Sequence, residues 1–162
     1  TQSTTFAMDL KKWLQIMETY EGGGHMYHTT LPTDALLRLQ EAMLETEAYG
    51  FAKVREEQIA LGRRVRALLL EHGFPSVAAP GFEAPGVVVS YTTDPEIQSS
   101  KKFLALGLQT AAGVPLQCDE PADFRTFRMG LFGLDKWHNV DRTLQQLSGA
   151  LETIAPKAKL AA

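Results

Sequence analysis

Apolar residues recur at helical spacing from Pro32 to Gly73, and this long segment constrains the fold more than any other feature of the chain. One uninterrupted helix of that length would be unusual in a globular domain, and Gly50 interrupts the pattern. Proline suits the start, because the first helical turn does not need the N–H that proline lacks. We therefore predict a long helix that is bent or broken near Gly50 and ends at Gly73.

Shorter elements flank this segment. Residues 8–20 keep helical spacing, and the three glycines at 22–24 end the helix. Another helix starts at Asp94 and Pro95. A last helix with a clean apolar face is capped by Asn139 or Asp135. Strands are predicted at residues 87–91, 108–112 and 124–132. The order predicts an α+β fold, with a small and mostly antiparallel sheet covered by helices on one side.

Charge and composition exclude several function classes. The net charge is −3 and no basic stripe is present, so no nucleic-acid partner is expected. Arg63, Arg64 and Arg66 lie within a helical pattern, and we interpret them as a solvated face. The single cysteine, Cys118, excludes a disulfide within the chain and a multi-cysteine zinc site, and it indicates a reducing compartment. No apolar run approaches the roughly 20 residues of a membrane span, so the predicted location is cytoplasmic.

The segment Met26–Pro32 gathers hydroxyl groups and an imidazole ahead of a helix. Such a loop can bind an anion through side-chain hydroxyls and backbone amides, and an ordinary polar loop before a capped helix is the alternative. His25 and His28 lack a nearby carboxylate or cysteine, so we predict no metal site.

A second informative segment is Phe124–Gly133, in which Arg128 lies within an apolar run. Strand alternation places Thr126 and Arg128 on one face, and Phe127 and Met129 on the other. An arginine in so apolar a strand needs an anionic partner, and its planar fork matches a carboxylate. That carboxylate could belong to a ligand or to a protein side chain, and both interpretations stay open.

Together the two segments resemble the C-terminal part of class V, fold-type I aminotransferases, in particular the alanine–glyoxylate and serine–glyoxylate aminotransferase group. Residues 26–32 resemble the family's Tyr-His-x-Thr-x-Pro loop, and residues 127–133 resemble its Arg-Ile-Gly-x-x-Gly strand. Residues 5–13 and 111–113 fit two further family segments in the same order.

The resemblance implies a pyridoxal 5'-phosphate (PLP) enzyme that acts as a homodimer. In that family, the large domain of one subunit and this loop of its partner hold the cofactor phosphate. Tyr27 and Thr30 match the phosphate contacts, and Arg128 matches the arginine that binds the substrate α-carboxylate. No role follows for His28, and Arg125 is a second candidate for acidic substrate groups.

The family's Schiff-base lysine lies in the large domain, and none of the eight lysines of this chain stands in a matching context. We therefore expect no catalytic residue here, an inactive isolated chain, and a longer natural enzyme rather than a separate subunit. The expected organisation is a segment at residues 1–31 that links to the absent large PLP domain and carries the phosphate loop. An aminotransferase small domain at 32–155 and a frayed tail at 156–162 would follow.

The expected reaction moves an amino group from an amino acid, alanine or serine, to a 2-oxo acid, glyoxylate or pyruvate. Two alternatives stay open. The chain could be a stand-alone module that binds a small anion or mediates dimerisation, or it could be a domain of a 2-aminoethylphosphonate–pyruvate transaminase.

Overall fold

The computed structural model describes residues 5–156, so the first four residues and most of the predicted tail lie outside the described part. The chain divides into two compact units between Met43 and Leu44. The predicted division at residues 31 and 32 stays a prediction, and each unit is described by itself.

The first unit begins with α1 (Leu10–Glu21). The Asp9 side chain caps this helix by accepting a hydrogen bond from the Lys12 amide at 3.1 Å. Gly22 ends the helix, and Gly23 adopts a φ of 78°, which a residue with a Cβ rarely does. The glycine run is therefore a helix stop, as its sequence predicts.

The predicted long helical segment forms two consecutive helices. The first, α2 (Thr33–Tyr49), begins in the first unit, and α3 (Phe51–Glu71) belongs to the second. Gly50 separates them with a φ of 101°, and Gly73 follows α3 with a φ of 83°. The predicted break at Gly50 is confirmed. None of the residues of α2 is buried, although its sequence has an apolar stripe.

The second unit contains a three-stranded sheet with the order β1-β3-β2, in which both pairings are antiparallel. Its strands are β1 (Val87–Tyr91), β2 (Ala111–Ala112) and β3 (Thr126–Gly130). Its further helices are α4 (Pro95–Gln98), α5 (Lys101–Ala105), α6 (Leu134–His138) and α7 (Val140–Ile154). The predicted α+β fold is confirmed, and two of the strands are shorter than predicted.

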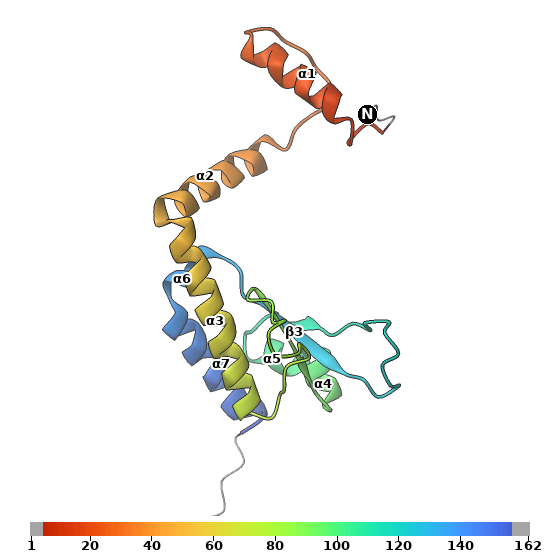
Figure 1. Ribbon diagram of the computed structural model, residues 1–162, viewed down its shortest axis with the longest axis vertical. Coiled ribbons are helices and arrows are strands. Elements are labelled where there is room, and N and C mark those ends of the chain that lie inside the picture. Colours follow the sequence, from red (N-terminus) through yellow and green to blue (C-terminus); the bar gives the residue numbers. More distant parts are fainter. Residues whose placement is uncertain (1–4, 157–162) are drawn as a thin grey trace, which may run out of the picture. The chain divides into compact units, whose positions relative to one another are not determined.

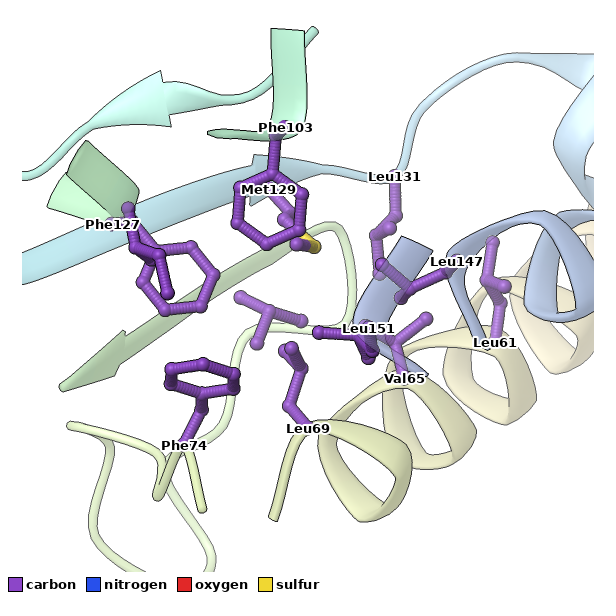
Figure 2. Packing of buried hydrophobic residues seen from close by; sticks show 12 residues of the cluster. Leu61, Val65, Leu69, Phe74, Phe103, Phe127, Met129, Leu131, Leu147 and Leu151 are labelled. Atoms are coloured by element: carbon purple, nitrogen blue, oxygen red, sulfur yellow. The ribbon is translucent and has the colours of Figure 1, made fainter. Parts of the chain in front are cut away.

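One face of the sheet forms the core of this unit. Pairing of Val88 with Met129, and of Ser90 with Phe127, directs these four side chains to the same face. The helices α3 and α7 lie side by side in the second unit (Figure 1), and their leucines meet the sheet in one apolar cluster (Figure 2). Phe103 of α5 is fully buried there, with its ring centroid 5.5 Å from that of Phe127.

The predicted solvated face of three arginines is wrong for Arg66. Arg63 and Arg64 are exposed, but the Arg66 guanidinium is half-buried and donates to the carbonyls of Ala84 at 2.6 Å and Val87 at 3.0 Å. These partners lie in the loop before β1 and at the first residue of β1, and helical spacing alone carries no information about them.

Candidate functional site

Arg128 occupies the middle of the central strand, on the face opposite the core. Its register partners are Val89 of β1 and Ala111 of β2. The neighbouring residues Phe127 and Met129 point into the core and are buried. The alternation predicted for this strand is therefore observed, and Arg128 is half-exposed on the open face of the sheet.

The Arg128 guanidinium is oriented without being neutralised. Its Nε donates to the Ala112 carbonyl oxygen at 3.0 Å. Within residues 5–156, Arg128 has no carboxylate within 4.0 Å, and its two Nη groups have no hydrogen-bond acceptor. A protein ion pair, one of the two interpretations of the sequence, is absent from the described residues. The Nη groups remain available to bind a carboxylate in a two-pronged way.

Gly113 fixes the position of the carbonyl that orients Arg128. A Cβ at Gly113 would lie 2.1 Å from both the carbonyl oxygen and the hydroxyl of Thr126, so only glycine fits. The Gly113 amide donates to the Thr126 carbonyl at 3.0 Å. This contact holds β2, and with it the Ala112 carbonyl, close to β3.

The loop before α2 brings two hydroxyl groups together. The Tyr27 hydroxyl and the Thr30 Oγ1 lie 3.4 Å apart, and both side chains are exposed. Their spacing allows both hydroxyls to contact one tetrahedral anion, such as a phosphate group. The structure thus brings together the two residues predicted to bind a cofactor phosphate, within the first unit.

His28, in the same loop, has a different environment. Its ring stacks on Phe6 with a centroid distance of 4.3 Å and meets the edge of Trp13 at 4.9 Å. The His28 Nε2 is buried and has no hydrogen-bond partner within the described chain. The ring therefore anchors the loop to the start of the chain, and this contact had no sequence signal beyond the aromatic residues themselves.

Arg125 lies one residue before β3 and is exposed. Its carbonyl accepts a hydrogen bond from the Thr92 amide at 3.1 Å, so the chain is still extended here. The odd offset of three residues directs Arg125 away from the face that carries Arg128.

Glu120 was missed by sequence reasoning. Its carboxylate accepts three backbone hydrogen bonds, from Leu116 at 2.6 Å, Gln117 at 2.9 Å and Cys118 at 2.8 Å. These amides, chiefly those of Cys118 and Gln117, lower the pKa of Glu120 to about 2. Through these three hydrogen bonds the carboxylate fixes the loop between β2 and β3, and Glu120 lines a small cavity together with Gly113 and Thr126.

Two further expectations concern metals and membranes. Within residues 5–156, no group of three histidine, cysteine or carboxylate side chains is placed to hold a metal ion. No helix in the same range is long and apolar enough to cross a bilayer.

Neither a known family model nor a curated protein sequence matches the chain. The crystal structure of an alanine–glyoxylate aminotransferase from Nostoc sp. is similar to it, with a TM-score of 0.69 and 17% sequence identity. The similarity covers 93% of this chain and 39% of that aminotransferase chain, so this chain spans about two fifths of that protein. The resemblance inferred from the sequence is thereby confirmed at the level of the fold: the chain has the fold of part of an alanine–glyoxylate aminotransferase.

Proposed function

We propose that this chain is the C-terminal part of a PLP-dependent aminotransferase, to which it contributes binding side chains rather than the cofactor-binding lysine. The observation that carries this proposal is Arg128, held on the open face of the sheet by a backbone carbonyl with both Nη groups unpaired in the described chain. The fold similarity to an alanine–glyoxylate aminotransferase supports it. The substrates proposed are alanine or serine as amino donor, and glyoxylate or pyruvate as acceptor.

Arg128 binds and orients the substrate carboxylate. Because Nε is engaged by Ala112, the carboxylate oxygens accept from the two Nη groups, end-on to the guanidinium. Such a two-pronged contact fixes the direction of the bond between the carboxylate carbon and Cα, and thereby the orientation of the Cα–H bond.

Tyr27 and Thr30 fit the cofactor phosphate. Their two exposed hydroxyls, 3.4 Å apart, can both donate to phosphate oxygens. When bound, PLP supplies the electron sink that makes proton removal from Cα feasible. In the proposed homodimer, these hydroxyls hold the cofactor of the partner subunit, and the large PLP-binding domain of the same protein supplies the lysine. We place the enzyme in the cytoplasm.

The location of the cofactor lysine is tested by titrating this chain with PLP, followed by borohydride reduction and peptide mapping of modified lysines. Weak labelling, scattered over several surface lysines, is expected. One stoichiometric and saturable modification at a single lysine would show that the chain carries its own cofactor site, and would contradict the proposal.

The role of Arg128 is tested in the complete enzyme with Arg128→Gln and Arg128→Lys. Loss of a charge-assisted contact to a carboxylate costs about 1.5–3 kcal/mol, so kcat/KM for the amino acid should fall roughly 10- to 100-fold. Lysine keeps the charge but not the fork, and should restore only part of this loss. Arg142→Gln is the matched control, because Arg142 is exposed and paired with Asp135 at 2.6 Å. Unchanged KM and kcat in Arg128→Gln would remove Arg128 from the substrate site.

A further inference from the structure

Three arginines other than Arg128 line a groove in the second unit, between α3 and the segment before β1. The groove has a volume of about 770 Å³. We call it the arginine groove, and its walls include Arg55, Ile59, Arg63, Arg66, Glu83 and Pro85. A volume of this size is within the range of small-molecule sites.

The wall opposite α3 is held firmly in place. A Cβ at Gly62 would lie 2.6 Å from the Pro85 carbonyl oxygen, so the loop touches the helix backbone. The Gln58 side-chain amide donates to the same carbonyl at 3.0 Å, and Arg66 donates to Ala84 at 2.6 Å. The groove is therefore built before any ligand arrives, which lowers the entropic cost of binding.

The charge of the groove is unbalanced. Three arginines face one carboxylate, that of Glu83, which accepts a hydrogen bond from the Gly81 amide at 2.9 Å. Within residues 5–156, none of these three arginines has a carboxylate within 4.0 Å. By contrast, Arg64 of the same helix pairs with Asp141 at 2.7 Å. The groove thus keeps an excess of about two positive charges along one face of α3.

Burial makes this charge costly for Arg66. Loss of hydration lowers the pKa of the Arg66 guanidinium, and the nearby Glu83 carboxylate opposes that shift only in part. Its hydrogen bonds go to carbonyl oxygens, which orient the guanidinium but carry no full negative charge. An anion in the groove would stabilise this side chain.

We propose that the arginine groove binds a small molecule that carries a phosphate group. A phosphate dianion matches the excess of two charges, and the guanidinium fork matches phosphate oxygens. Ile59 and Pro85 provide apolar surface for the organic part of such a ligand. This site is distinct from the proposed cofactor and substrate contacts, because Tyr27, Thr30 and Arg128 do not line it.

The test uses the isotopically labelled chain in PLP-free buffer, titrated with inorganic pyrophosphate and with phenyl phosphate while amide resonances are followed by NMR. Saturable shifts are expected for the amides of residues 55–66 and 81–84, and binding should be weaker at higher salt. Arg63→Gln and Arg55→Gln, both on exposed positions of α3, should each weaken binding about tenfold, the loss expected for one charge-assisted hydrogen bond. Arg38→Gln is the control, because Arg38 pairs with Glu41 outside the groove, and its binding should be unchanged.

Three results would overturn the proposal: no saturable shift, shifts that persist in both groove variants, or an equal response to chloride at matched ionic strength. Binding of a polyglutamate peptide without binding of either phosphate compound would assign the groove to an acidic protein segment instead. None of these results bears on Arg128, so this inference and the proposed function fail separately.

Discussion

The close approach between α3 and the loop before β1 predicts an unusual result for Gly62→Ala. In most helices this change is stabilising, because alanine has the higher helix propensity. At Gly62 the new Cβ would lie 2.6 Å from the Pro85 carbonyl oxygen and 3.0 Å from the Pro85 Cα, whereas ordinary contact begins at 3.4 Å. Both atoms belong to the backbone, so the loop must retreat by about 0.8 Å.

The magnitude follows from the contacts that this retreat disturbs. Higher helix propensity contributes at most about 1 kcal/mol in favour of alanine. Overpacking costs about 1–3 kcal/mol. The hydrogen bonds of Gln58 to Pro85 and of Arg66 to Ala84 would weaken, at a cost of up to about 1 kcal/mol each. The net expectation is a loss of about 2 kcal/mol in the free energy of unfolding.

The chain provides its own control in Gly149, which lies within α7 and has no atom within 4 Å of an added Cβ. Gly149→Ala should raise the free energy of unfolding by up to about 1 kcal/mol. Urea denaturation followed by circular dichroism measures both variants, and the two midpoints should shift in opposite directions. If Gly62→Ala is stabilised as much as Gly149→Ala, the loop does not contact the helix backbone, and the preformed wall of the arginine groove does not exist.

Asp94 and Glu120 both have a lowered pKa, and each leads to a testable expectation. The hydrogen bond from Lys102 is the main reason that the pKa of Asp94 is lowered, so its contribution to stability is present above the ordinary pKa and is lost as the pH falls through the lowered one. Asp94→Asn should therefore lower the urea midpoint at pH 7, with a difference that shrinks toward pH 2; a constant difference would contradict the pairing. Glu120, whose pKa is lowered to about 2 by backbone amides, should stay ionised down to that pH in a carboxyl NMR titration. Glu120→Ala should accelerate hydrogen exchange of the amides at residues 116–118, and unchanged exchange would mean that the carboxylate does not hold them.

Sequence patterns within a single segment predicted those elements whose formation depends on that segment alone. The apolar face of α7 is confirmed, because Leu147 and Leu151 are buried as helical spacing requires. The break at Gly50 is also confirmed. Glycine adopts a positive φ without steric cost, so this signal is present in the residue type itself. Asn139 takes the predicted N-cap position of α7, but the predicted side-chain cap is wrong. The Asn139 side chain makes no capping hydrogen bond and instead donates to the Asp135 carbonyl at 3.1 Å.

Contacts between distant segments could not be predicted in the same way. Strand alternation was enough to place Arg128 opposite the core, but it could not identify the Ala112 carbonyl as its partner, sixteen residues away. The helical pattern around Arg66 predicts a solvated face, whereas the carbonyls that Arg66 binds lie 18 and 21 residues away. Side-chain partners in loops depend on the tertiary path of the chain, and periodicity carries no record of that path.

Four arginines of the second unit fall into two groups by the kind of acceptor they use. Arg64 and Arg142 bind carboxylates at 2.7 Å and 2.6 Å, so their charges are neutralised within the protein. Arg66 and Arg128 donate to backbone carbonyls, which fix the guanidinium plane but carry no full negative charge. A protein carboxylate beside Arg128 would occupy the two Nη groups that the proposed substrate needs, and would compete with that substrate at a high effective concentration. Orientation by a carbonyl avoids this competition, and the same physical reason underlies the proposed anion sites at Arg128 and in the arginine groove.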